Sequence, residues 1–329
     1  MGNERRFAAL NTKIRVLKGN FLTNEHFIDL FNKKDVSEVA QYLKENTNYK
    51  IVLEDINVKD IHRRELEKLL KEYVLIQHKK LIHYFTDEYK KLFKTIFIRY
   101  EIEDLKLNLR NLLREEDTSD LETFIKSLKD TMYYPILKPY LNEDSRRILF
   151  YMEMNLDRLY FLLLRKNSTA LDKKDSILFK EFLGKNIDLL NLEWIYRGIK
   201  FYNLIPEELI NYTIQEGYEF KYNDIKVLCY CNEKEFKKRV LNSKYSFLFD
   251  TEQNIDLYME RRIERYLYFQ SLEMLKKEKL DITVFLAYIH LLEYELRDLF
   301  STIEIIKYGI SFDEGKNYLI RKIEGSDIR

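Results

Sequence analysis

The chain has 329 residues, 46% of them hydrophobic, and so it is long enough for a sizeable core and for two or three domains. Its 56 Lys and Arg nearly balance its 55 Asp and Glu, which argues against nucleic acid or anionic lipid as a partner. No apolar stretch approaches the roughly 20 residues that span a bilayer. The N-terminus lacks an apolar export signal, and Cys229 and Cys231 are too close for a mutual disulfide, so we expect a cytoplasmic protein.

Residues that break helices are rare in this chain. It contains 8 Gly and 3 Pro, and none of them lies between Asn20 and Tyr134. Tight turns and sheets need such residues. Apolar residues recur at helical spacing, for example at Leu66, Leu70 and Val74. The sequence therefore predicts an all-α protein.

One pattern occurs three times: a helix-capping residue, Glu three positions later, and then Thr or Ser, any residue, Tyr, two residues and an apolar pair. The copies are Asp35, Glu38, Thr47, Tyr49, Val52, Leu53; Ser119, Glu122, Thr131, Tyr133, Ile136, Leu137; and Asn232, Glu235, Ser243, Tyr245, Leu248, Phe249. The capping residue and Glu predict a reciprocal capping box at the start of a short helix. Because the hydroxyl competes for backbone hydrogen bonds, we expect Thr or Ser to end that helix. We assign Thr47, Tyr49, Thr131, Tyr133, Ser243 and Tyr245 a structural role.

A second signature closes the longer helical region after each short helix. It reads Asn108, Leu109, Leu112, Arg114 in the first copy, Asn191, Leu192, Ile195, Arg197 in the second, and more loosely Glu295, Leu296, Leu299, Ser301 in the third. The two signatures keep their order in all three copies. Such an internal repeat is typical of proteins that build a shaped surface. We expect three similar helical-bundle domains, at residues 1–116, 117–204 and 205–329.

Two features superficially suggest an enzyme. Glu116, Asp117 and Asp120 could hold Mg²⁺ on one helix face, but the repeat places them at the start of a helix, where acidic residues are stabilising. The stretch from Gly309 to Asn317 resembles a phosphate loop, but it is one residue too long and carries acidic residues. We also interpret the five histidines as ordinary surface or boundary residues. We name no catalytic residue, cofactor or metal ligand.

The order of these motifs resembles a known family, the central-stalk C subunits of archaeal and bacterial V-type (A/V-type) rotary ATPases, whose eukaryotic relative is the d subunit of the vacuolar ATPase. The resemblance covers essentially the whole chain. It rests on Phe7 to Arg15, Tyr42, Leu43, Thr47 and Tyr49; on Asp188, Leu189, Asn191, Leu192, Ile195, Tyr196, Arg197, Lys200, Phe201 and Tyr202; and on Glu293, Glu295, Leu296, Arg297 and Leu299.

The resemblance implies three domains arranged as a pseudo-threefold funnel without an active site. It also implies a rotor component on the cytoplasmic face of the cell membrane, peripheral to it, that joins the D and F shaft subunits to the proteolipid rotor ring. The catalytic A and B subunits would be indirect partners, and the complex would couple ATP to proton or sodium transport. The alternative is a helical-repeat scaffold that binds cytosolic partners, although spacings of 84 and 113 residues between the copies exceed those of solenoids.

Overall fold

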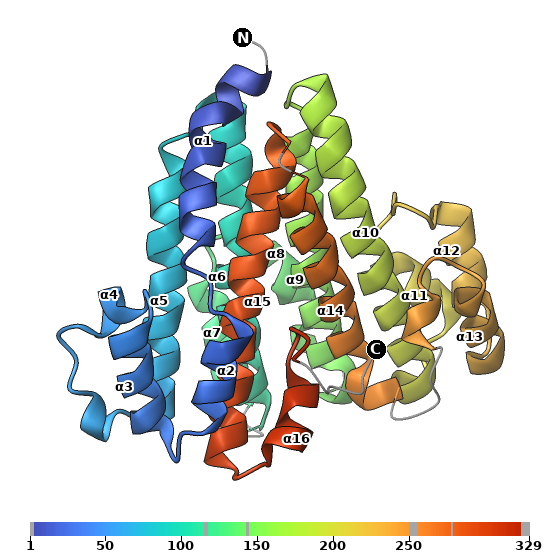
Figure 1. Cartoon of the computed structure of the whole chain (residues 1–329). Helices are drawn as coiled ribbons and strands as arrows, with labels where there is room; N and C mark the ends of the chain where they lie inside the picture. Colours follow the sequence, from blue (N-terminus) through green and yellow to red (C-terminus); the bar gives the residue numbers. More distant parts are fainter. Residues whose placement is uncertain (1–2, 115–117, 143–144, 250–254, 278, 324–329) are drawn as a thin grey trace. The chain divides into compact units, whose positions relative to one another are not determined.

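The computed structural model describes residues 3–114, 118–142, 145–249, 255–277 and 279–323, and these residues form helices and connecting turns without a strand. The helices, shown in Figure 1, are α1 (Asn3–Lys18), α2 (Asn24–Phe31), α3 (Val36–Asn46), α4 (Lys50–Leu53), α5 (Arg63–Ile82), α6 (Asp87–Arg114), α7 (Thr118–Ser127), α8 (Tyr134–Leu137), α9 (Ser145–Ser168), α10 (Lys173–Arg197), α11 (Pro206–Tyr212), α12 (Tyr222–Cys229), α13 (Glu233–Leu241), α14 (Ile255–Lys276), α15 (Ile282–Lys307) and α16 (Phe312–Gly315). The prediction of an all-α protein is confirmed.

Local sequence explains where several helices begin. The side chain of Asp35 accepts a hydrogen bond from the Glu38 N–H at 2.9 Å, and that of Asn232 accepts one from the Glu235 N–H at 3.0 Å. The side chain of Glu235 in turn accepts a hydrogen bond from the Asn232 N–H, which completes the predicted capping box. In the first copy Glu38 instead reaches the N–H of Lys34, one residue before the cap. The capping residue of the second copy, Ser119, lies outside the described side chains.

The chain forms two compact units. The first unit contains both ends of the chain, Met1–Tyr84 and Thr251–Arg329. Its centre is α15, which packs against α1, α2, α3, α5 and α14. Because neighbours surround it, α15 is buried on nearly every side, as at Phe285, Leu292 and Leu299.

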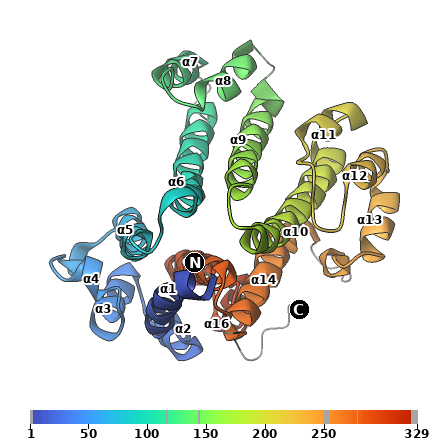
Figure 2. The ribbon, with the colours of Figure 1, turned by 90° about the horizontal axis from the view of Figure 1, so that it is seen from above.

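The second unit is Phe85–Asp250. Figure 2 shows α6 and α9 side by side, and α9 also packs against α10 and α11. The helix α10 continues into one π-helical turn, Gly198–Tyr202, which ends at Asn203 in the left-handed conformation with φ 48°. The short helices α12 and α13 follow after α11. The pseudo-threefold arrangement of three domains stays a prediction.

Candidate functional site

In each copy the repeated hydroxyl donates to a carbonyl three or four residues earlier and accepts from the N–H of the repeat tyrosine. Thr47 Oγ1 donates to the carbonyl of Leu43 at 2.6 Å and accepts from the N–H of Tyr49 at 3.2 Å. Thr131 and Ser243 make the equivalent pairs of bonds. A side-chain oxygen thus replaces the next helical turn and directs the chain out of the short helix. This turn positions the tyrosine that follows.

Each repeat tyrosine donates its hydroxyl to a carboxylate on a long helix. The three pairs are Tyr49 with Glu295 at 3.0 Å, Tyr133 with Glu101 at 2.6 Å, and Tyr245 with Asp188 at 2.8 Å. Tyr49 and Tyr245 are fully buried, and Tyr133 is 6% exposed. Burial raises the pKa of Tyr49 and of Tyr133, so these two hydroxyls keep their protons and act as donors. The repeat tyrosines therefore fix a short helix to a long one.

The carboxylates are the residues that the sequence did not identify as partners. Asp188 lies between Ile187 and Leu189, and Glu295 lies between Tyr294 and Leu296. An acid flanked on both sides by apolar helix residues is the signal that could have found both. In the predicted division, Tyr133 and Tyr245 contact a helix of the domain before their own. Tyr49, in the first predicted domain, contacts a helix of the third. The contact follows from the tertiary structure, and no local pattern encodes it.

Two neighbouring polar residues of α10 hold the loop before α12. Asp188 accepts hydrogen bonds from the N–H groups of Glu219 at 2.7 Å and Phe220 at 3.2 Å, in addition to that from Tyr245. Asn191, one turn later, donates to the carbonyl of Ile214 and accepts from its N–H, at 2.7 and 2.8 Å. Both side chains are fully buried. Burial raises the pKa of Asp188, and its donors oppose that rise.

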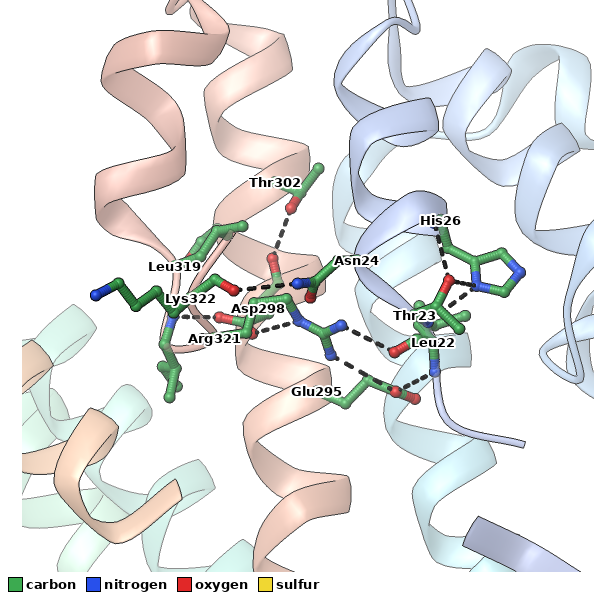
Figure 3. Close-up of polar contacts among 12 residues, drawn as sticks. Leu22, Thr23, Asn24, His26, Glu295, Asp298, Thr302, Leu319, Arg321 and Lys322 are labelled. Atoms are coloured by element: carbon green, nitrogen blue, oxygen red, sulfur yellow. Dashed lines mark hydrogen bonds and ion pairs between the residues drawn. The ribbon is translucent and has the colours of Figure 1, made fainter. Parts of the chain in front are cut away.

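A matching pair on α15 lies at the centre of the first unit (Figure 3). Glu295 accepts from the Leu22 N–H at 2.6 Å and from Tyr49, and Nη2 of Arg321 lies 3.9 Å away. Asp298 accepts from the N–H of Ile320 at 2.6 Å and from Nε of Arg321 at 3.1 Å. Burial raises the pKa of Glu295 to about 7 and also raises that of Asp298, although Arg321 opposes both shifts.

The structure corrects the register of the third copy of the second signature. Glu295 and Asp298 have the same spacing as Asp188 and Asn191 and equivalent partners. The first residue of each pair accepts the hydroxyl of a repeat tyrosine, and the second accepts a backbone N–H. Glu295 therefore corresponds to Asp188 and not to Asn191. The sequence was ambiguous here because a leucine follows each of these three residues.

Arg321 joins the two ends of the chain. Its Nη1 donates to the carbonyl of Leu22 at 2.8 Å, and its guanidinium lies 3.8 Å from the ring centroid of Phe27. It is only 4% exposed. Nearby, Arg265 donates to the carbonyls of Leu319 and Ile320. We call Glu295, Asp298, Arg321 and their backbone partner Leu22 the terminal clamp.

The remaining predicted residues are scattered. Asn108 is exposed, and the side chain of Arg114 lies outside the described part. Arg197 is 45% exposed and pairs with Glu193 at 3.5 Å. The structure therefore does not bring the second signature together as one cluster, because its members occupy both buried and solvent-facing sides of their helices.

The acidic cluster and the histidines can be placed in part. Glu116 and Asp117 lie outside the described residues, and Asp120 is exposed in the first turn of α7. The prediction that all histidines are surface or boundary residues is wrong for His78, which is 2% exposed on α5. Burial lowers its pKa to about 4. Within the described ranges, no three His, Cys, Asp or Glu side chains gather into a group that could hold a metal.

The buried carboxylates of Asp188, Glu295 and Asp298 accept hydrogen bonds from groups of the protein itself. These hydrogen bonds therefore fix helices and loops to one another. Among the helices that the structure describes, none has the length and apolar character needed to cross a membrane.

Comparison with known proteins gives consistent matches. The sequence model of the ATP synthase (C/AC39) subunit family matches residues 10–318. The C subunit of the A-type ATP synthase of Methanosarcina mazei is 23% identical over 263 residues, which are 73% of this chain and 71% of the relative. The corresponding protein of Methanocaldococcus jannaschii is 26% identical over 239 residues, 65% and 59% of the two chains. That of Methanobrevibacter smithii is 23% identical over 320 residues, 88% and 81% of the two chains.

Proposed function

The chain belongs to the ATP synthase (C/AC39) subunit family, and from that premise we propose that it is the non-catalytic central-stalk component of a V-type rotary ATPase. In this role it links the D and F shaft subunits to the proteolipid rotor ring and transmits torque between them. The A and B subunits are indirect partners, and the complex couples ATP to proton or sodium transport. The observation that carries the proposal is the family match over residues 10–318.

The packing of the chain supports a mechanical role. A torque adaptor must resist shear between the elements that receive and deliver force. Close-packed helices deform little, and directional hydrogen bonds resist sliding. Tyr49 and Tyr245 provide such bonds at buried carboxylates, so the short helices are tied to the long ones inside each unit. The terminal clamp ties both ends of the chain to α15 in the same way.

The proposal also assigns a place in the cell. We propose that the chain is peripheral to the cytoplasmic face of the cell membrane and is held there by the rest of the complex. Its nearly balanced charge suits contact with proteins rather than attraction to lipid.

Affinity purification tests the partners. The tagged chain is purified from its own membranes in mild detergent, and the copurifying proteins are identified by mass spectrometry. We expect the A, B, D and F subunits and the rotor proteolipid. Recovery of a monomer, or of unrelated cytosolic proteins in constant ratio, would instead favour the scaffold function.

Reconstitution tests the coupling. Complexes assembled with and without the chain are placed in liposomes, and ATP hydrolysis and ion transport are measured together. We expect the complex that lacks the chain to hydrolyse ATP without transporting ions. Transport at the normal ratio to hydrolysis in its absence would contradict the proposal. Stoichiometric nucleotide binding by the purified chain in calorimetry would count against a non-catalytic role.

A further inference from the structure

The internal repeat provides a built-in comparison between α2 and α12. The two helices bury equivalent positions, Phe27 and Leu30 in α2 and Ile225 and Leu228 in α12. In both, the third helical residue accepts the N–H of the capping residue at 2.9 Å, through His26 in α2 and through Asp224 in α12. Both helices precede a short helix, α3 or α13, that is followed by a repeat tyrosine. They are therefore the same element in two copies of the repeat.

The solvent-facing sides of these two helices differ. Three exposed positions are Asn24, Asp29 and Asn32 in the first copy, and Tyr222, Val227 and Tyr230 in the third. The three apolar or aromatic residues are 46%, 44% and 56% exposed, respectively. Since α2 forms with polar residues at the same places, the packing of this element does not require the apolar ones. Their presence needs another explanation.

The exposed residues of α12 share one side. At about 100° per residue, Tyr222, Lys226, Tyr230 and Val227 follow one another within an arc of about 140°. We call these four residues the α12 patch; α12 and α13 are labelled in Figure 1. The hydroxyl of Tyr230 donates to Glu207 of α11 at 2.7 Å, which holds this ring in place. Tyrosines held in this way bind partners at a low cost in conformational entropy.

The net charge of the segment from this helix to the repeat tyrosine also has the opposite sign in the two copies. Residues 222–244 contain six basic and three acidic residues, a net charge of +3, whereas the equivalent residues 24–48 contain three basic and five acidic residues, a net charge of −2. The three acids of the third copy are engaged locally: Asp224 and Glu235 cap their helices, and Glu233 pairs with Lys237 at 2.6 Å. Lys226, Lys234, Lys238 and Arg239 are exposed. The surface therefore offers cations beside aromatic rings.

We propose that the α12 patch and the adjoining basic residues of α13 form a docking surface for an acidic amphipathic segment of a partner protein. The tyrosines and Val227 cover the apolar side of that segment, and Lys226 and Lys234 face its carboxylates. The nearly balanced charge of the whole chain gives no net attraction to an anionic bilayer, and α12 has only 8 residues, so a bilayer is the less suitable partner. This inference depends on the surface alone and not on the proposed stalk function.

Zero-length crosslinking tests the proposal directly. The tagged full chain is purified with its complex in detergent and treated with a carbodiimide, which joins lysines only to carboxylates in contact. Linked peptides are then identified by mass spectrometry. We expect Lys226 or Lys234 to be joined to Asp or Glu of another polypeptide, within a segment that also carries apolar residues at helical spacing. Linkage of lysines elsewhere on the chain, with neither of these two linked, would overturn the proposal.

The repeat itself supplies the matched variant. Tyr222→Asn, Val227→Asp and Tyr230→Asn together give α12 the residues of α2 at these three exposed positions. We expect these links to fall about tenfold or more, the size of effect that central aromatic anchors produce. The control is Val16→Asn, Ile51→Asp and Tyr308→Asn, three similarly exposed apolar residues of the first unit, which should leave the links unchanged. Equal loss in both variants would overturn the proposal.

Two further measurements complete the test. If the triple variant fails to fold, the double variant Lys226→Glu, Lys234→Glu changes only exposed charges. We expect this double variant to weaken crosslinking of the neighbouring Lys238. We also expect the crosslinking yield to depend on the salt concentration. Flotation of the purified chain with vesicles that contain phosphatidylglycerol tests the membrane alternative. Flotation that the triple variant abolishes, without protein crosslinks at the patch, would assign this surface to lipid and overturn the proposal.

Discussion

The hydroxyl of Tyr49 donates to the carboxylate of Glu295, 246 residues later in the chain, at 3.0 Å. The last long helix thereby completes the first copy of the repeat. Tyr133 and Tyr245 contact long helices through residues that precede them by 32 and 57 positions. In all three copies the tyrosine thus docks on the preceding long helix of the repeat, and Tyr49 does so by joining the two ends of the chain. The contact that completes the first copy therefore lies inside the first unit.

Removing the hydroxyl of Tyr245 should destabilise the protein. In Tyr245→Phe the buried Asp188 loses one of its three donors, and a buried acceptor left without a partner costs about 1–3 kcal/mol. Tyr133→Phe is the matched control, because its partner Glu101 is exposed and water can replace the hydroxyl. Urea unfolding followed by circular dichroism gives both values. Equal losses would show that burial of the carboxylate does not determine the cost.

Truncating the repeat tyrosine has a larger expected effect. Tyr133→Ala removes a ring that is 6% exposed, and aromatic truncation in a core costs about 3–5 kcal/mol. The melting midpoint of the purified chain measures the change. An unchanged midpoint would show that the ring contributes no packing.

Breaking the terminal clamp should release the last segment of the chain. Arg321→Gln leaves Glu295 and Asp298 without their buried cation, and the loss of one partner of a buried ion pair costs about 3–5 kcal/mol. Limited proteolysis should then cut near Leu319 to Ile323 sooner than in the wild-type chain. Arg197→Gln is the control, since its pair with Glu193 is partly exposed and is expected to contribute less than about 1 kcal/mol. Unchanged cleavage in Arg321→Gln would contradict a holding role.

Glu295 should make the protein less stable as the pH rises. Its pKa is raised from 4.5 to about 7 in the folded chain, so between these values the folded state binds more protons than the unfolded state. The stabilisation is complete below the unfolded pKa and is lost as the pH rises through the folded pKa, by an amount on the order of a few kcal/mol. Unfolding in urea at pH 4.5 to 8 should show a smaller loss for Glu295→Gln than for the wild-type chain. Parallel pH profiles would rule out this contribution.

His78 should have the opposite effect. Its pKa is lowered from 6.5 to about 4 by burial, so the unfolded state binds the proton more readily. The contribution of neutral, buried His78 to the free energy of unfolding is present above pH 6.5 and is lost as the pH falls towards 4. In His78→Gln the stability should therefore fall less over this acid range, although the variant itself is less stable at neutral pH. A stability profile with the same acid slope as that of the wild-type chain would contradict this assignment.

Local sequence was sufficient for the helical class, the repeat and most of its short-range geometry. Asp35 and Asn232 cap their helices, and Thr47 and Ser243 end them, because each of these bonds joins residues only a few positions apart. The dispersed motifs were also sufficient to indicate the family, because their order along the chain does not depend on knowing the contacts. The division into three domains stays a prediction.

The tertiary structure alone decided which residues complete the candidate site. No local pattern sets the distance between Tyr49 and Glu295 or between Leu22 and Arg321, because these contacts depend on how the two ends of the chain meet. Nor could the sequence distinguish His78 as buried, since burial depends on neighbouring helices, or show that Tyr222 faces solvent. Capping and periodicity are short-range effects, whereas burial and long-range hydrogen bonds are set by packing. For that reason the sequence determined the helical repeat, and the packed chain determined the clamp and the exposed surface.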